Sequence, residues 1–135
     1  KGRIMTKLIH SMVRVSDLEA SINFYCSTLE LEISDQYVFD NFTLTYLANA
    51  KTAFELELTF NHDATEIYTH GSGYGHLAVS VEDIEQAHKR VTQLGITASE
   101  IKAFDHNQAH LATFFFITDP DGYKIEFLQR QGRYL

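Results

Sequence analysis

Four residues of the types that bind divalent metals recur at matching places in the two halves of the chain. His10 and His76 each lie near the start of an alternating apolar segment, and Glu57 and Glu126 each lie in a later one. Two imidazoles and two carboxylates suit Zn²⁺, Ni²⁺, Co²⁺ or Mn²⁺ better than Ca²⁺ or an ion that prefers thiolates. The residue types therefore predict one divalent metal site with room left for water or substrate.

The two halves are copies of one sequence unit, which accounts for this symmetry. A constant shift lays the first apolar segment of one half over that of the other and places His10 on His76. A slightly larger shift places Glu57 on Glu126, with the extra residues in the turn Asp119–Gly122. A pseudo-twofold axis relating the copies would gather the four side chains about one point.

Other interpretations of these four positions have to be weighed against a metal site. Each residue taken alone fits a hydrogen-bonded core or surface side chain. Two carboxylates that face one interior repel each other and lose hydration unless a cation holds them, so the symmetric set favours a metal. Glu55 is a rival ligand because it lies on the same strand face as Glu57. The repeat favours Glu57, since Glu55 corresponds to Lys124.

Strand and helix signals give each half the order βαβββ. A capping box at Ser16 and Glu19 predicts the start of the first helix, and Gly95 predicts the end of the second. The expected strands are Leu8–Val15, Leu31–Phe39, Phe42–Leu47, Phe54–Phe60, Gly75–Val81, Ile96–Ile101, Leu111–Thr118 and Tyr123–Gln129. We predict an α+β fold of two tandem modules, 5–66 and 67–135, that make one structural domain, with 1–4 a tag remnant before a native start at Met5.

The composition narrows the class of protein. The chain has 135 residues, of which 44% are hydrophobic, enough for one compact core. A formal net charge of -7 argues against a nucleic acid or an anionic membrane as partner, and no apolar run approaches the length of a membrane span. The single cysteine, Cys26, cannot form an internal disulfide and suits a reducing cytoplasm. These features favour a small molecule as the partner.

Three segments carry a family resemblance: Glu57–Asn61, Gly73–Val81 and Asp119–Glu126. They resemble bacterial glyoxalase I, also called lactoylglutathione lyase, in the vicinal oxygen chelate superfamily. The likeness covers nearly everything after Met5. The Asp-Pro-Asp-Gly turn marks only the superfamily, whereas the four-ligand set is more specific, because the dioxygenases and fosfomycin-resistance enzymes of the superfamily use two His and one Glu.

The resemblance implies an activity and an assembly. The expected substrate is the hemithioacetal of methylglyoxal and glutathione, which is isomerised to S-lactoylglutathione with one divalent metal per site, Ni²⁺ favoured and Zn²⁺ or Co²⁺ as alternatives. The resemblance gives Glu126 the role of the base that transfers the proton, and it makes Glu57 the partner of Glu126 on the opposite face. It also implies an eight-stranded open barrel and a homodimer with shared active sites, each taking His10 and Glu57 from one chain and His76 and Glu126 from the other.

Two further residues are candidates for substrate binding. Arg14 lies four residues beyond His10 on one strand face, and Asn61 lies four beyond Glu57, so each is displaced by about 13 Å along its strand. We expect Arg14 to pair with a glutathione carboxylate and Asn61 to bind the γ-glutamyl end. Departures from the family leave the thiol carrier open; one is Glu30, where relatives often have Gly after the helix.

Two other functions remain as alternatives. The first is another metalloenzyme of the same superfamily, an extradiol-type dioxygenase or a thiol transferase. The second is a non-catalytic protein that binds a small molecule.

Overall fold

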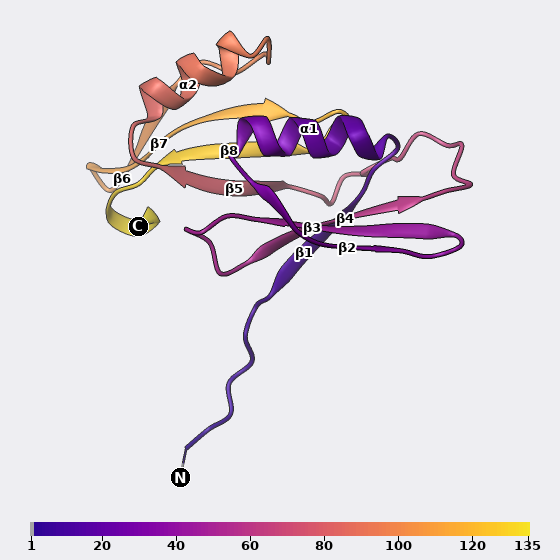
Figure 1. The fold of residues 1–135 in the computed structure, drawn as a ribbon. Coiled ribbons are helices and arrows are strands. Elements are labelled where there is room, and N and C mark those ends of the chain that lie inside the picture. The colour runs from indigo at the N-terminus through magenta and orange to yellow at the C-terminus, as the bar shows by residue number, and fades with distance from the viewer. Residues whose placement is uncertain (1) are drawn as a thin grey trace. The chain divides into compact units, whose positions relative to one another are not determined.

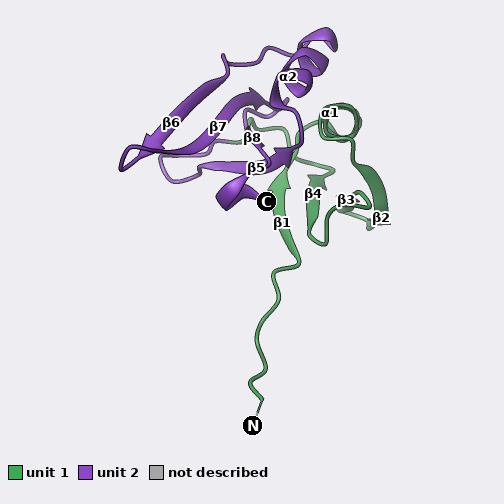
Figure 2. Ribbon diagram, turned by 90° about the vertical axis from the view of Figure 1, so that its left-hand side faces the viewer, with its two compact units in different colours: residues 1–68 green, residues 69–135 purple. Residues whose placement is uncertain are grey.

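The computed structural model describes residues 2–135 as two compact units, with the boundary between Tyr68 and Thr69 (Figure 2). Each unit has the element order βαβββ and contains one four-stranded mixed sheet and one α-helix (Figure 1). The α+β fold with two βαβββ modules is therefore confirmed. No helix formed by residues 2–135 has the length and apolar character needed to cross a bilayer.

In the first unit, the first and last strands along the chain lie side by side in the sheet. Its sheet order is β1-β4-β3-β2, in which β1 runs parallel to β4 and the other neighbours are antiparallel. This parallel pairing places the strand that carries His10 directly beside the strand that carries Glu57. The elements are β1 (His10–Arg14), α1 (Leu18–Thr28), β2 (Glu32–Val38), β3 (Phe42–Ala48) and β4 (Glu55–Asn61).

The second unit repeats this topology with sheet order β5-β8-β7-β6. Here β5 runs parallel to β8, so the strand with His76 lies beside the strand with Glu126. A short 3-10 helix, η1, follows the last strand. The elements are β5 (His76–Val81), α2 (Ile84–Gln93), β6 (Lys102–His106), β7 (Ala109–Thr118), β8 (Lys124–Gln129) and η1 (Gly132–Tyr134).

Alternation along the strands separates an apolar face of each sheet from a polar one. In the second unit α2 packs against β7 and β8. The buried rings of Phe115 and Phe127 stack there with centroids 4.6 Å apart. The residue before Phe127 is Glu126, which therefore points to the other face. In the first unit Leu56 and Leu58 are buried on either side of Glu57 in the same way.

The structure corrects two sequence predictions. The expected strand Ile96–Ile101 is wrong: this segment makes a single bridge, Ala98 to Ile117, and the strand β6 lies just after it. Every residue of β6 is exposed, so no alternation of apolar residues marks it. The N-cap of α1 is Asp17, whose carboxylate accepts a hydrogen bond from the Ala20 N–H at 3.1 Å, and not Ser16.

Candidate metal centre

A His and a Glu meet on the polar face of the first unit. Nε2 of His10 lies 2.9 Å from Oε1 of Glu57. In the sheet register His10 is opposite Glu55 and Met12 is opposite Glu57, so the pair joins adjacent strands diagonally. Residues two apart on a strand share a face, which lets the imidazole reach the further carboxylate.

The second unit has the equivalent pair in the equivalent register. Nε2 of His76 lies 3.1 Å from Oε1 of Glu126, and His76 is opposite Lys124 in the sheet. The shift inferred from the sequence repeat therefore corresponds to a repeat of side-chain geometry. Each unit contributes one nitrogen and one oxygen donor that face each other.

Both pairs have a deep carboxylate and a more open imidazole. The side chains of Glu57 and Glu126 are 10% and 15% exposed, whereas those of His10 and His76 are 34% and 41% exposed. Burial of a carboxylate is costly unless a proton, a hydrogen-bond donor or a cation compensates it. The imidazole supplies part of that compensation, and its open edge gives access for a ligand.

Glu55, the rival candidate ligand, makes a different contact from Glu57. The Ser34 hydroxyl donates a hydrogen bond of 2.5 Å to Oε2 of Glu55 and lies 3.1 Å from the Tyr46 carbonyl oxygen. Glu55 is thereby held toward β2, while Glu57 meets His10. The choice of Glu57 over Glu55 as a metal ligand stays a prediction.

An aromatic ring that the sequence analysis missed lies beside each pair. Tyr46 on β3 is opposite Glu57, and its ring meets the His10 ring edge-on with centroids 5.8 Å apart. Phe116 on β7 is opposite Glu126, and its ring meets that of His76 edge-on at 5.2 Å. The alternation of β3 and β7 could have placed these rings on the polar face, but only the register assigns each to its carboxylate.

The Tyr46 phenol has Glu57 as its neighbour across β3 and β4. Burial raises the pKa of the Tyr46 phenol above its usual value, and the negative charge of Glu57 raises it further. The phenol therefore keeps its proton at neutral pH. The equivalent neighbour of Glu126 is Phe116, which has no hydroxyl group.

The donor set of each pair fits a divalent metal. Two ligands at right angles with bonds of about 2.1 Å have donor atoms about 3.0 Å apart. The separations of 2.9 Å and 3.1 Å between nitrogen and oxygen match that value. Residues 2–135 contain no group of three or more His, Cys, Asp or Glu side chains that could hold a metal. The chain therefore has two half-sites, each with two donor atoms.

The two predicted substrate-binding residues lie in the first unit. Arg14 ends β1 and is exposed. Asn61 ends β4 and is partly buried, and its side-chain amide donates to the Tyr68 hydroxyl at 3.5 Å. Both follow their candidate ligand on the same strand by four residues, as the sequence indicated.

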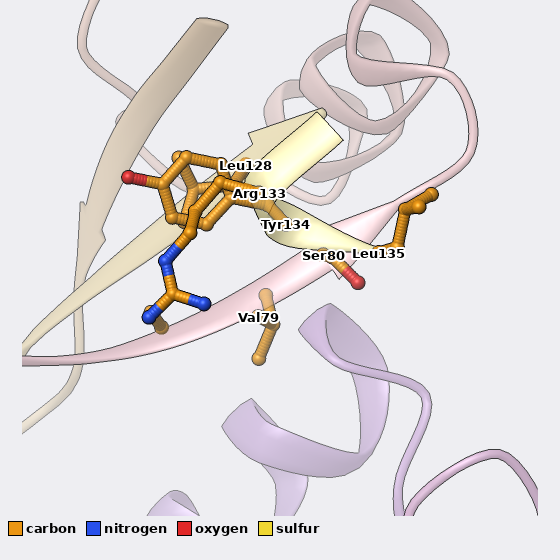
Figure 3. A pocket seen from close by; sticks show the side chains of 7 residues that line it. Val79, Ser80, Leu128, Arg133, Tyr134 and Leu135 are labelled. Carbon is orange, nitrogen blue, oxygen red and sulfur yellow. The ribbon is translucent and has the colours of Figure 1, made fainter. Parts of the chain in front are cut away.

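A hollow of about 300 Å³ lies in the second unit between β5, β8 and the C-terminal residues (Figure 3). Ala78 and Ser80 continue the strand face of His76, and Leu128 continues that of Glu126. The hollow reaches the size range of small-molecule sites. Its lining residues are Ala78, Val79, Ser80, Leu128, Arg133, Tyr134 and Leu135.

Comparison with known proteins gives one family for almost the whole chain. Residues 7–127 match the model of the glyoxalase/bleomycin resistance protein/dioxygenase superfamily. A lactoylglutathione lyase of Neisseria meningitidis is 39% identical over 131 residues, which cover 93% of this chain and 92% of that protein. A probable lactoylglutathione lyase of Synechocystis is 33% identical over 130 residues, which cover 93% and 97%.

Solved structures agree with these sequence relatives. The trypanothione-dependent glyoxalase I of Leishmania major is 32% identical with a TM-score of 0.72, over 93% of this chain and 87% of that one. An antibiotic-binding protein of Streptomyces, TnmS3, reaches a TM-score of 0.74 at 20% identity, over 95% and 98%. The second likeness shows the fold alone, and a fold by itself does not identify a function.

Proposed function

Because the chain belongs to the glyoxalase/bleomycin resistance protein/dioxygenase superfamily, we propose that it is a lactoylglutathione lyase. It isomerises the hemithioacetal of methylglyoxal and glutathione to S-lactoylglutathione. The observation that carries the proposal is the pair of repeat-equivalent contacts, His10 with Glu57 and His76 with Glu126. A binding protein gains nothing from two semi-buried carboxylates, each facing an imidazole, whereas a proton-transfer enzyme needs this arrangement.

The proposed ligands of one divalent metal are His10, Glu57, His76 and Glu126. We propose Ni²⁺ as the preferred ion, with Zn²⁺ or Co²⁺ as alternatives. The metal, when bound, supplies Lewis-acid stabilisation of the negative charge that develops on the substrate oxygens. The two half-sites join in a homodimer in which one chain supplies His10 and Glu57 and the other supplies His76 and Glu126.

The reaction moves hydrogen between two neighbouring carbons and needs no redox cofactor. Glu126 accepts the proton from the carbon that bears the sulfur and returns it to the adjacent former carbonyl carbon. The hydroxyl proton passes from the first oxygen to the second, so atoms and electrons balance and the product is a thioester. A carboxylate is the appropriate group, because it can accept and release a proton within one turnover.

The substrate-binding residues of the proposal are Arg14 and Asn61. The exposed Arg14 guanidinium pairs with a carboxylate of the tripeptide in a charge-assisted contact. Asn61 provides amide hydrogen bonds to the γ-glutamyl end. A cytoplasmic location belongs to the same proposal, because a thiol co-substrate requires a reducing compartment.

An ultraviolet assay of thioester formation tests the function. Metal-stripped protein receives Ni²⁺, Zn²⁺ or Co²⁺ in separate reactions, with methylglyoxal and either glutathione or trypanothione, the thiol in the name of the Leishmania neighbour. Thioester with glutathione supports the proposal, and thioester with trypanothione alone would correct the thiol. Tight metal binding without thioester in any reaction would contradict it and favour another metalloenzyme of the superfamily. Light scattering that gives a monomer at micromolar concentration would exclude the shared site.

A further inference from the structure

His62 follows β4 directly and fastens the end of that strand to the neighbouring hairpin. Its Nδ1 lies 3.1 Å from the Asp40 carbonyl oxygen, and its Nε2 lies 2.8 Å from Oγ1 of Thr43. Its backbone N–H donates a hydrogen bond of 2.9 Å to the Asn41 carbonyl oxygen. One residue therefore makes three hydrogen bonds to the β2–β3 turn and the start of β3.

The partners of the His62 ring define its hydrogen bonds. A carbonyl oxygen can only accept, so Nδ1 carries the hydrogen, and in the neutral ring Nε2 accepts from the Thr43 hydroxyl. Thr43 is only 5% exposed, and the Phe60 ring lies beside the imidazole with centroids 5.6 Å apart. The Thr43 hydroxyl is thus shielded from water and depends on His62 as its hydrogen-bond partner.

Asn61, the residue before His62, has its side chain on the opposite face of the sheet. Alternation places this amide on the polar face with Glu57, while His62 shares the buried face with Phe60. The Asn61 amide nitrogen donates to the Tyr68 hydroxyl at 3.5 Å. Its amide oxygen accepts no hydrogen bond from residues 2–135, so an acceptor on the polar face is available to a ligand.

The chain beyond His62 offers the strand end little support. Residues 63–67 are all exposed, and segments with few buried contacts open at low cost in free energy. The three hydrogen bonds of His62 therefore restrict the end of β4 from behind, while Asn61 faces forward. An error in the position of this strand end would move the Asn61 amide with it.

We propose that His62 is a positioning residue for substrate binding, which fixes the Asn61 amide where it meets the γ-glutamyl end. An amide suits that end, because its oxygen can accept from an α-ammonium group and its N–H can donate to an α-carboxylate. The identity of the ligand rests on the proposed function. The role of His62 adds a residue that determines affinity for the tripeptide without touching it.

Binding of S-methylglutathione to Ni²⁺-loaded protein, measured by calorimetry, tests the inference without turnover. The comparison ligand is N-acetyl-S-methylcysteinylglycine, which lacks both the α-ammonium and the α-carboxylate of the γ-glutamyl end. Thr43→Val removes the hydroxyl and keeps the side-chain shape, and His62→Phe keeps a flat ring without nitrogens. In both variants the Kd for S-methylglutathione should rise about threefold to tenfold, and that for the comparison ligand should stay within about twofold.

Thr45→Val is the matched control. Thr45 lies two residues further along the same face of β3, is fully buried, and its hydroxyl accepts from the Gln36 side chain at 2.8 Å. This variant loses a hydrogen bond of the same kind away from His62, so it should bind both ligands like the wild type. A loss equal to that in Thr43→Val would mean that any missing hydroxyl in β3 perturbs the site, and would overturn the inference.

Asn61→Ala tests whether His62 acts through Asn61. If it does, Thr43→Val added to Asn61→Ala should weaken S-methylglutathione binding no further, because coupled residues are not additive. A further loss as large as in the wild-type background overturns the inference. Equal losses for the two ligands in Thr43→Val, or wild-type affinity in that variant, also overturn it.

The remaining outcomes separate this inference from the proposed function. Circular dichroism checks folding, and if His62→Phe does not fold, Thr43→Val decides. If the comparison ligand binds too weakly to measure, the Asn61→Ala background decides. A wild-type chain that binds S-methylglutathione but forms no thioester contradicts the proposed function, and the binding comparison still tests His62. A wild-type chain that forms thioester without binding S-methylglutathione overturns the inference alone, and one that does neither overturns both.

Discussion

Glu30 and Gly95 occupy the same left-handed position, immediately after the C-cap residues of α1 and α2, with φ of 57° and 86°. Glycine adopts this conformation without steric cost, whereas a residue with a Cβ is strained in it. Two helices that end alike are therefore terminated by one relaxed residue and one strained residue. The Glu30 carbonyl accepts a bond from the Asn49 side chain, which any residue at position 30 would preserve.

Glu30→Gly should stabilise the protein. Removal of the Cβ relieves roughly 1–2 kcal/mol of strain. The greater freedom of glycine in the unfolded chain offsets roughly 0.5–1 kcal/mol of this, so a net gain centred on about 0.75 kcal/mol is expected. Urea unfolding measures it. Gly95→Ala is the paired variant, and it should lower the urea concentration at the midpoint of unfolding. Equal stability of the wild type and Glu30→Gly would show that the turn is not strained.

Glu126→Gln should abolish most of the turnover. The amide cannot carry the proton, so kcat should fall by about 10²–10⁴ while the fold, checked by circular dichroism, is kept. Glu55→Gln removes a carboxylate from the polar face of the first unit and should retain activity, because Glu55 is bonded to Ser34 and not to His10. Comparable activity in Glu126→Gln would remove Glu126 as the base.

Metal removal should lower the melting temperature. Ni²⁺ at a hundred times its dissociation constant should stabilise stripped protein by about 2.7 kcal/mol, if it binds the folded chain alone. His76→Ala deletes one donor of the proposed ligand set and should reduce this shift. Calorimetry with and without Ni²⁺ measures both, and a shift as large in His76→Ala as in the wild type would place the ion elsewhere.

Arg14→Ala should mainly weaken substrate binding. Loss of a charge-assisted contact at a distance from the reacting carbons should raise the KM for the glutathione adduct about tenfold and leave kcat within about twofold. Lys89→Ala, a cation lost from the exposed side of α2, is the control for net charge. An unchanged KM in Arg14→Ala would show that this side chain does not meet the substrate.

Cys26 should react slowly with alkylating agents. Burial raises the pKa of its thiol, and the negative charge of Glu32 raises it further. Less thiolate is present at a given pH. At pH 8, iodoacetamide should therefore alkylate Cys26 more slowly than it alkylates free glutathione, and the rate for Cys26 should increase as the pH rises. The same shift stabilises the fold below the thiol pKa of the unfolded chain, about 8.5, and that contribution is lost as pH rises through the folded pKa. Alkylation as fast as that of glutathione would contradict the shift.

The sequence determined the two modules and the residue types of the half-sites. Alternation in the central strands and the repeat of His10 on His76 and of Glu57 on Glu126 are local patterns, because each depends only on the period of a strand and on spacing along the chain. The Asp119–Gly122 turn could be predicted because its signal is also local. Gly122 has φ of 90°, and the Asp119 carboxylate accepts hydrogen bonds from the Asp121 and Tyr123 N–H groups.

The repeat also contained a signal that was overlooked. Asp17 aligns with Asp83, and each caps its helix through a side-chain carboxylate. Ser16 aligns with Glu82, which is a poor N-cap, so the alignment favoured the aspartates over the capping box that was predicted.

Only the tertiary structure decided which side chains meet. The exposed edge strand β6 has no buried face to impose a pattern, so its position is fixed by hydrogen bonds to β7 and not by its own residues. Glu57 lies against His10, whereas Glu55 accepts a hydrogen bond from Ser34. The match between Tyr46 and Phe116 was hidden because the β3–β4 and β7–β8 turns differ in length. In each hairpin the turn and the buried face of the strands together set the register, so the residue opposite each carboxylate becomes known only when the strands have paired.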